Sequence, residues 1–522
     1  MAAALVGVVS AALALGVGEL VAGLESRLAS PVETVAAQVI DMAPLPLERF
    51  AIETFGSNDK FALVVGILSS CLVFAVTLGI AARRRPLVGP IGMAGFALVG
   101  AAAALARPGT GAIVVLPSLA AGVAGIACFR LVGRRALGRT TGEPAAAPSA
   151  ASTASAVVVP ITRGGMGDRR MFLGLTSAAA ATAVVAAVGG RALRGRFSAA
   201  QSRAQVRLPA AARRLPTPPA GIEVGVDGVA PFVTPNAEFY RVDTALLVPQ
   251  VRAEDWTLRV TGMVDRPVEL TYAELIGRDL VEADITMTCV SNPVGGDLVG
   301  HARWLGVLAS DLLDGARPRR GADQLVGRSV DGYTCGFPLE AAYDRDCLVA
   351  VGMNGEPLPL RHGFPARLVT PGLYGYIGST KWLTELEVTT FDAFDQYWVR
   401  RGYADRAPIK TMARIDTPRS LTRIDPGPTV VAGVAWAQTR GIDAVEVRVD
   451  DGAFEPAQLA DPLSDDAWRQ WRFDWDATPG SHTLTVRAVD GTGEAQTDQR
   501  ADVVPDGASG WMSLVVQVED EP

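Results

Sequence analysis

Five long apolar stretches near the start of the chain limit its possible folds more than any other feature. They run over residues 2–24, 61–82, 87–106, 112–132 and 171–190, and the last four contain no charged residue apart from Arg130. About 20 apolar residues cross a bilayer as a helix, which satisfies its own backbone hydrogen bonds in lipid. Buried helices of a soluble core are the alternative, which is disfavoured because so few charges interrupt the stretches. We therefore expect about five membrane spans.

The distribution of charge predicts an orientation. Residues 1–200 carry 17 Lys and Arg against 9 Asp and Glu, a net charge of +8, and the overall charge of −7 then leaves −15 for residues 201–522. Arg-rich segments follow the second and fourth spans, whereas residues 25–60 hold six acids and three bases. Cytoplasmic segments are enriched in Arg and Lys, so we expect a multi-pass protein of the cell membrane with its C-terminal part outside the cytoplasm. Four Arg after the fifth span run against this rule: Arg191, Arg194, Arg196 and Arg203.

One linker is expected on each side of the fifth span. Residues 1–135 hold four spans, and residues 136–170 are predicted to be a cytoplasmic linker that ends in Arg169-Arg170-Met-Phe-Leu. This motif resembles the twin-arginine export signal, although an Arg pair before a span also determines topology by itself. Residues 191–221, which are rich in Pro, are predicted to be an extended linker after the span at 171–190.

The remainder of the chain changes from mixed to all-β patterns. Over residues 222–405, short β-branched runs alternate with brief helical patterns at 272–276 and 307–313, which predicts a mixed α/β domain. Over residues 406–522, alternating strands at 429–436, 444–452, 471–475 and 482–491 are bounded by Asp-Gly and Pro-Gly turns, which predicts an immunoglobulin-like sandwich. The expected fold class is α+β, with a helical transmembrane bundle in front.

Two segments of the mixed domain carry the chemistry. Cys289 ends an apolar run in Met-Thr-Cys-Val-Ser-Asn, and His362 and Arg367 stand five apart in a loop rich in Gly and Pro. Lys381, one of only three lysines in the chain, follows a Ser-Thr pair. A thiol offers a soft metal ligand, while the cations suit a phosphorylated cofactor. Taken in this order, the segments resemble the sulfite oxidase family of molybdopterin-dependent enzymes.

The resemblance implies a sulfite oxidase fold and a molybdenum–molybdopterin cofactor, with Cys289 as the thiolate ligand of the metal. A phosphate on the cofactor needs cations, and Arg367 with Lys381 would supply them. The resemblance also covers Pro-Asn-Ala-Glu-Phe-Tyr-Arg at 235–241. The residues expected to bind the cofactor are Asn236, Phe239, Tyr240, Arg241, Cys289, Ser329, His362, Arg367, Ser379, Thr380 and Lys381.

The family also implies an activity, the oxidation of sulfite to sulfate by oxo transfer. The segment Trp-Val-Arg-Arg-Gly-Tyr at 398–403 resembles a family motif in which the Tyr hydrogen-bonds near the metal, although Tyr403 stands one residue further along than the family spacing. Arg241 would hold the small oxyanion substrate. The expected catalytic residues are Cys289, Arg241, Tyr403, Arg303 and Arg400. Reductive oxo transfer from a sulfoxide, an N-oxide or nitrate is the alternative, and a scaffold or assembly protein is the alternative without catalysis.

Partners follow from the same observations. All three His lie beyond the last span and there is no Cys-x-x-Cys-His, so we expect no haem in this chain and an external electron acceptor such as a cytochrome. The acidic soluble part argues against binding to nucleic acid. The C-terminal domain resembles the dimerisation domain of the family, which implies a possible homodimer. Cys335 and Cys347 either form a disulfide or remain buried thiols.

Overall fold

A computed structural model describes residues 1–25, 28–44, 46–47, 50, 54–55, 59–106, 111–137 and 166–520. The chain divides into two compact units, Met1–Ser198 and Ala199–Pro522. Most of the predicted cytoplasmic linker, residues 138–165, lies outside the described residues.

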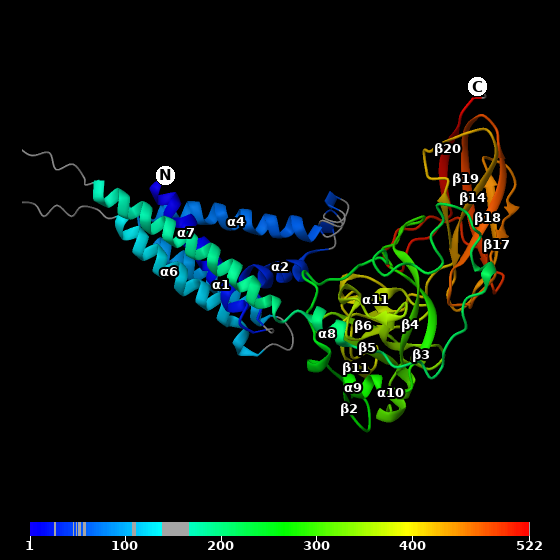
Figure 1. Ribbon diagram of the computed structural model, residues 1–522, viewed down its shortest axis with the longest axis horizontal. Coiled ribbons are helices and arrows are strands. Elements are labelled where there is room, and N and C mark those ends of the chain that lie inside the picture. Colours follow the sequence, from blue (N-terminus) through cyan, green and yellow to red (C-terminus); the bar gives the residue numbers. More distant parts are fainter. Residues whose placement is uncertain are drawn as a thin grey trace, which may run out of the picture. The chain divides into compact units, whose positions relative to one another are not determined.

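The first unit is helical, and its described residues include five helices that are long and apolar enough to cross a membrane. These are α1 (Ala2–Ala22), α4 (Asp59–Ala81), α5 (Val88–Leu105), α6 (Leu116–Leu137) and α7 (Met166–Gly195). They confirm the five apolar stretches as helices, and α7 begins before its predicted span and ends after it. Within this unit α1 packs between α6 and α7 and also contacts α4 (Figure 1).

Small residues let these helices approach one another closely. A Cβ atom placed on Gly79 of α4 would lie 2.1 Å from the carbonyl oxygen of Ala3 in α1, and one placed on Gly190 of α7 would lie 2.4 Å from that of Glu19. Such contacts give van der Waals attraction between backbones, which drives helix association where no water is present to be expelled.

A shorter amphipathic helix, α2 (Pro31–Met42), was not predicted. Its start carries a capping box, in which Ser30 and Glu33 each accept a hydrogen bond from the backbone N–H of the other. This Ser-Pro-Val-Glu signal is present in the sequence. Glu33 also pairs with Arg194 in the last turn of α7, and the Glu19 carboxylate lies 3.8 Å from the same guanidinium. One Arg that runs against the charge rule is therefore engaged by two acids.

The second unit begins with two sheets that form the mixed domain. One has the order β10-β9-β7-β4-β3, with β8 beside β7, and the other has the order β2-β1-β11-β5-β6. Their strands are β1 (Thr257–Gly262), β2 (Val268–Thr271), β3 (Val281–Thr288), β4 (Val299–Leu308), β5 (Gln324–Ser329), β6 (Thr334–Pro338), β7 (Leu348–Met353), β8 (Glu356–Pro357), β9 (Arg367–Val369), β10 (Ser379–Thr380) and β11 (Leu383–Thr389). All pairs are antiparallel except β1 with β11, which is parallel.

Short helices complete this domain. The predicted helix at 272–276 is α9 (Tyr272–Ile276), and that at 307–313 is α10 (Ala309–Ala316), two to three residues later than predicted; a further single turn is α11 (Gly375–Gly378). Within the segment expected to be an extended linker, α8 (Ala199–Gln205) forms, and Arg213 then bridges to Val281 at the start of β3. Part of that segment therefore packs on the domain.

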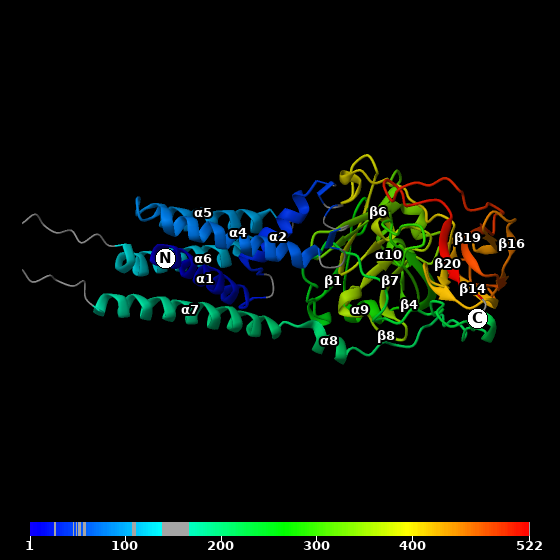
Figure 2. The ribbon, with the colours of Figure 1, turned by 90° about the horizontal axis from the view of Figure 1, so that it is seen from above.

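The C-terminal domain is an all-β sandwich, as predicted (Figure 2). Its sheets have the orders β12-β14-β18-β17 and β13-β20-β19-β15-β16. The strands are β12 (Met412–Thr417), β13 (Arg423–Ile424), β14 (Gly427–Trp436), β15 (Ile442–Val449), β16 (Glu455–Pro456), β17 (Gln458–Leu459), β18 (Arg469–Ala477), β19 (Gly480–Asp490) and β20 (Met512–Val518).

The sandwich covers one face of β3. The backbone N–H of Trp468 donates to the Thr286 hydroxyl at 2.7 Å, its indole N–H donates to the Phe232 carbonyl at 2.9 Å, and the Gln438 amide donates to the Thr286 carbonyl at 2.9 Å. Side chains alternate along a strand. The residues of β3 that face away from Thr286, such as Met287, are therefore left to form the site described next.

Candidate active site

Cys289 lies just after β3, at the start of a turn that Asn292 closes. The Asn292 side chain accepts a hydrogen bond from the Leu298 backbone at 2.9 Å, and the Asn292 backbone N–H donates to the Cys289 carbonyl at 3.0 Å. Burial raises the pKa of the Cys289 thiol, while hydrogen bonds from Ser291 and the charge of Lys381 oppose that shift. The buried thiol therefore stays protonated at neutral pH unless a cation such as a metal ion displaces the proton.

Arg367, the first residue of β9, is a buried cation with neutral partners. Its guanidinium donates to the Ser379 hydroxyl at 3.1 Å, lies 3.4 Å from the Met287 sulfur, and stands 5.2 Å from the centre of the Trp304 ring. The antiparallel pairing of β9 with β10 brings Ser379 to this place. Burial lowers the pKa of Arg367 to about 10, against the opposing influence of Tyr240 and Asp243. A buried charge without a bonded counter-ion is costly, so the position favours an incoming anion.

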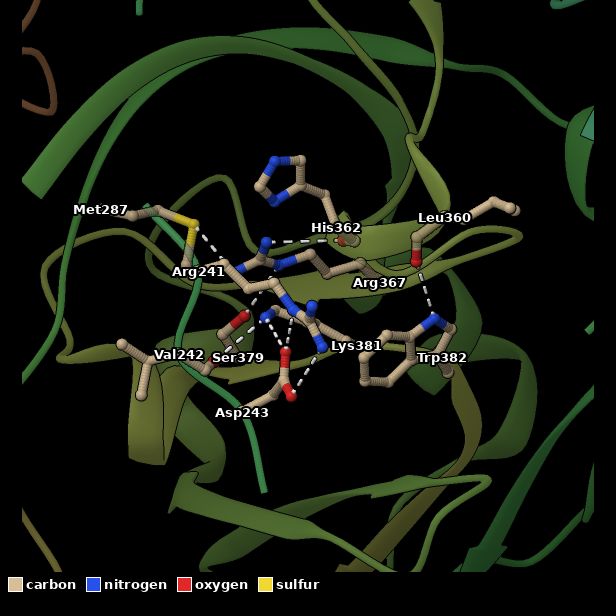
Figure 3. A network of polar contacts seen from close by, with 10 residues as sticks. All are labelled: Arg241, Val242, Asp243, Met287, Leu360, His362, Arg367, Ser379, Lys381 and Trp382. Carbon is tan, nitrogen blue, oxygen red and sulfur yellow. Dashed lines mark hydrogen bonds and ion pairs between the residues drawn. The ribbon is translucent and has the colours of Figure 1, made fainter. Parts of the chain in front are cut away.

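Lys381 and Arg241 share one carboxylate, that of Asp243 (Figure 3). The Lys381 ammonium donates to Asp243 Oδ2 and to the Val242 carbonyl, both at 3.0 Å. Arg241 donates to both oxygens of Asp243, through Nε at 2.7 Å and Nη2 at 3.2 Å. Burial lowers the pKa of Lys381 to about 8, and the nearby Asp243 opposes the shift. Arg367, Lys381 and Arg241 together carry more charge than the Asp243 carboxylate, so the group has a net positive charge.

His362 lies beside this group with one ring nitrogen unsatisfied. Its Nε2 lies 2.9 Å from the Asn236 carbonyl, which can only accept, so Nε2 carries the proton. Nδ1 is then an acceptor, and it has no hydrogen-bond partner among the described residues. Burial and the charges of Arg367 and Lys381 lower the pKa of His362 to about 3, which keeps the ring neutral.

The loop that carries Lys381 is held in an unusual conformation. Trp382, which is 1% exposed, has φ of 50°, and its indole donates to the Leu360 carbonyl at 3.0 Å. A bulky residue in the left-handed region persists only where its surroundings impose it. Gly363 has φ of 110°, and a Cβ there would lie 3.0 Å from Lys381 Cα. The backbones of the His362 and Lys381 segments therefore approach closely only because Gly363 has no side chain.

Aromatic residues line the same region. Phe239 is 1% exposed and stacks on Tyr240 at 5.3 Å between ring centres, with edge contacts to Trp304 and His362. Burial raises the pKa of Tyr240, and the Cys289 sulfur adds to the shift while Arg367 opposes it. The group that the structure brings together therefore comprises Phe239, Tyr240, Arg241, Cys289, His362, Arg367, Ser379 and Lys381.

Some predicted site residues lie outside this group. Arg303 is on the opposite face of β4 from Trp304 and makes a two-pronged ion pair with Asp284, at 2.9 and 2.6 Å. Thr380 points away from Ser379 and donates to the Gly327 carbonyl at 3.3 Å. Alternation of side chains along each strand separates these residues from their neighbours in sequence.

Three further predicted residues have local roles. Ser329 ends β5, and its N–H donates to the Tyr333 carbonyl across a tight turn at 2.9 Å. Arg400 is exposed, with its guanidinium 5.9 Å from the centre of the Phe394 ring. The Asn236 side chain donates to Glu356 at 2.6 Å and accepts from Asn354 at 2.9 Å, so Asn236 meets His362 only through its backbone.

Tyr403 packs among other rings, with its centre 5.4 Å from that of Tyr376 and 5.2 Å from that of Trp398. Tyr333, which the sequence did not single out, donates through its hydroxyl to the Tyr376 carbonyl at 2.8 Å. Burial, and then the Cys335 and Cys289 sulfurs, raise the pKa of Tyr333. Tyr333 therefore connects the region of Cys289 to the rings around Tyr403.

The sequence missed two more members of the site. Asp243 follows Arg241 by two residues, a spacing that places two side chains on one side of an extended segment, and this was the available signal. Met287 was hidden within an apolar strand. Of the alternatives for Cys335 and Cys347, the structure has buried free thiols. The Cys347 sulfur lies 3.2 Å from the Thr370 hydroxyl.

Comparison with known proteins assigns the family. The profile of the family described as the oxidoreductase molybdopterin binding domain matches residues 245–398, and that of a bacterial Ig domain matches residues 412–486. The oxidoreductase YuiH of Bacillus subtilis (strain 168) is 33% identical over 148 residues, which are 72% of that protein and 28% of this chain. The chain belongs to the sulfite oxidase family of molybdopterin-dependent oxidoreductases.

Other members of this family match a longer part of the chain. Mitochondrial sulfite oxidase of Rattus norvegicus is 27% identical over 322 residues, 52% of this chain and 58% of the rat protein. The chain thus spans somewhat over half the length of that relative. Among solved structures, the sulfane dehydrogenase SoxCD of Paracoccus pantotrophus is similar with a TM-score of 0.49 at 23% identity, over 57% of this chain and 85% of that one.

The residues of the site fit the molybdopterin cofactor that the family implies. The unpaired Nδ1 of His362 is available to accept a hydrogen bond from a ligand, and Arg367 and Lys381 offer a buried excess of positive charge to an anionic group. The Cys289 thiol lies close enough to Lys381 for the ammonium to lower its pKa. An acceptor, cations and a soft ligand are therefore present at one buried place.

Proposed function

We propose that this molybdopterin-dependent oxidoreductase oxidises sulfite to sulfate and passes the electrons to an external carrier. The observation that carries the proposal is the group formed by Cys289, Arg367, Lys381 and Arg241. It combines a buried soft ligand with an excess of cations, which suits an anionic cofactor and a small oxyanion next to it. The relatives named sulfite oxidase favour sulfite as that oxyanion.

The residues have distinct tasks in this proposal. Arg367 and Lys381 would hold the anionic group of the cofactor, His362 Nδ1 would accept a hydrogen bond from an N–H of the cofactor, and the Cys289 thiolate would be the protein ligand of the metal. The bound cofactor supplies oxygen-atom transfer coupled to a change of two electrons.

Arg241 holds the substrate through the edge of its guanidinium that Asp243 leaves open. Its Nη1 has no hydrogen-bond partner among the described residues, and the side chain is 27% exposed. Tyr403, which packs against Tyr376 and Trp398, is the residue proposed to add a hydrogen bond to the substrate. A fixed donor that faces an anion needs no reorganisation when the anion arrives.

The proposed location is the cell membrane, with the enzyme domain outside the cytoplasm. The five apolar helices support the anchoring, and the Arg-rich segments and the motif at Arg169-Arg170 support the orientation and export after folding. The C-terminal domain is the part through which two subunits would pair, and a soluble cytochrome is the proposed acceptor.

The direction of the reaction is tested with the purified full-length protein in detergent. We expect molybdenum in the protein and reduction of cytochrome c that depends on added sulfite. The competing assay supplies reduced viologen and a sulfoxide, an N-oxide or nitrate. Turnover in the second assay and none in the first would replace sulfite oxidation by reductive oxo transfer, and no molybdenum together with no turnover in either would leave only a scaffold role.

Two substitutions test the assigned roles. Cys289→Ser should abolish turnover while the pterin stays largely bound, because one thiolate ligand is lost; Cys347→Ser, at another buried thiol, should stay active. Arg241→Gln should raise KM for sulfite more than it lowers kcat, because a contact to the bound anion is lost. Full activity of Cys289→Ser would contradict the metal assignment.

A further inference from the structure

Asp243 occupies an unexpected place for a carboxylate, inside a site whose cations should attract anions. Its side chain is 7% exposed and bonds Lys381 and Arg241 at once (Figure 3). Both oxygens contact Arg241, and Oδ2 contacts Lys381 as well. The carboxylate is therefore fixed between a cation assigned to the cofactor and the cation assigned to the substrate.

This arrangement orients Arg241. Because Nε and Nη2 bond Asp243, the opposite edge of the guanidinium, which includes Nη1, is the one left for a ligand. An anion bound to that edge lies on the far side of the guanidinium from Asp243. Asp243 therefore repels the bound anion, from which it is separated by the width of one guanidinium group.

Charge also distinguishes among anions. The Coulomb energy is proportional to the product of the two charges, so Asp243 repels a dianion twice as strongly as a monoanion at the same place. Arg241 attracts the dianion more strongly in the same proportion, and Asp243 offsets much of that advantage. A site without Asp243 would favour the more highly charged ligand.

We infer that Asp243 tunes the charge preference of the substrate site, because it reduces the advantage that a doubly charged oxyanion would otherwise have over a singly charged one. The inference rests on the proposed function and refines it. Sulfate, a dianion, therefore leaves this site more readily than it would leave a site without Asp243.

The test compares sulfate with perchlorate, because both are tetrahedral oxyanions and they differ in charge. Binding of each to the oxidised full-length holoenzyme is measured by calorimetry at constant ionic strength. Asp243→Asn should shift the ratio of the two dissociation constants toward sulfate by about tenfold or more, since one repulsive charge is removed. Asp243→Ser is a second neutral variant, and molybdenum content is measured for each.

Two controls must keep the wild-type ratio. Asp243→Glu retains the charge, and Asp265→Asn removes a charge from an exposed ion pair with Arg319. If the neutral variants weaken both anions equally, Asp243 only positions Arg241 and the inference is wrong. An unchanged ratio, or no binding of either anion to the wild type, overturns it as well. A shifted ratio in a protein that does not oxidise sulfite would instead sink the proposed function and leave the charge preference intact.

Discussion

Replacement of Arg367 by Met should have opposite effects on the cofactor-free and the loaded protein. Arg367 is 5% exposed, and burial lowers its pKa from 12.5 to about 10. Each pKa unit corresponds to about 1.4 kcal/mol, so holding the charge in the folded protein costs up to roughly 3 kcal/mol. Met has a similar length and no charge. Because its hydrogen bonds to Ser379 and His362 are lost at the same time, we expect the cofactor-free variant to be about 1–2 kcal/mol more stable than wild type.

The loaded protein should respond in the other direction. A charge-assisted hydrogen bond to the anionic group of the cofactor contributes about 1.5–3 kcal/mol, so Arg367→Met should weaken cofactor binding by roughly 10-fold to 100-fold. The assay measures thermal unfolding of protein from a host that cannot make the cofactor, where we expect a midpoint higher by about 2–8 °C. Protein from a competent host is assayed for molybdenum.

A matched control removes an exposed Arg. Arg319 is paired with Asp265 at 3.1 Å, and its side chain is 59% exposed, so Arg319→Met should change neither the midpoint nor the molybdenum content appreciably. The reasoning would be refuted if cofactor-free Arg367→Met unfolded at a lower temperature than wild type, or if the variant retained its full molybdenum content. Either result would mean that the buried charge of Arg367 is not retained for binding an anion.

Three more predictions concern packing and pH. Gly79→Leu should disrupt the contact of α4 with α1, because a Cβ at this position would lie 2.1 Å from the Ala3 carbonyl oxygen. Size-exclusion chromatography in detergent checks this. The control Gly66→Leu, where a Cβ meets nothing within 4 Å, should remain monodisperse. Burial lowers the pKa of His301 from 6.5 to about 4. The contribution of neutral His301 to the free energy of unfolding is therefore complete above pH 6.5 and falls by about 1.4 kcal/mol per pH unit as the pH decreases toward 4. Denaturant titrations at several pH values check this, and a His301→Gln variant whose free energy of unfolding falls equally steeply with decreasing pH would contradict it. In the cofactor-free protein, burial lowers the pKa of Lys381 to about 8, so the affinity for sulfate, measured by calorimetry, should decline above that pH. In Lys381→Arg, whose guanidinium stays charged, the affinity should not decline over the same pH range.

Much of the architecture could be predicted because it depends on local patterns. Apolar length alone predicted the helices later seen as α1, α4, α5, α6 and α7, since a continuous apolar run of about 20 residues is typical of a helix that can cross a membrane. Alternation and turn residues identified the sandwich strands, and β14 and β19 begin within two residues of the expected positions. The helix α2 was not predicted, although the sequence contains its Ser30–Glu33 capping box, because a short amphipathic helix does not produce a long apolar stretch.

The candidate site likewise combines features that the local sequence predicts with features that only the fold determines. The sequence by itself determined which chemical groups are available: the thiol of Cys289, the neighbouring His362 and Arg367, and a rare Lys381. Only the tertiary structure decided how they are used. It paired Arg303 with Asp284 on the far face of β4, and it placed Asp243 between two cations from segments about 140 residues apart. The physical reason is that facing and pairing depend on strand register and on which surfaces are buried, and neither is encoded by the spacing of residues within one segment.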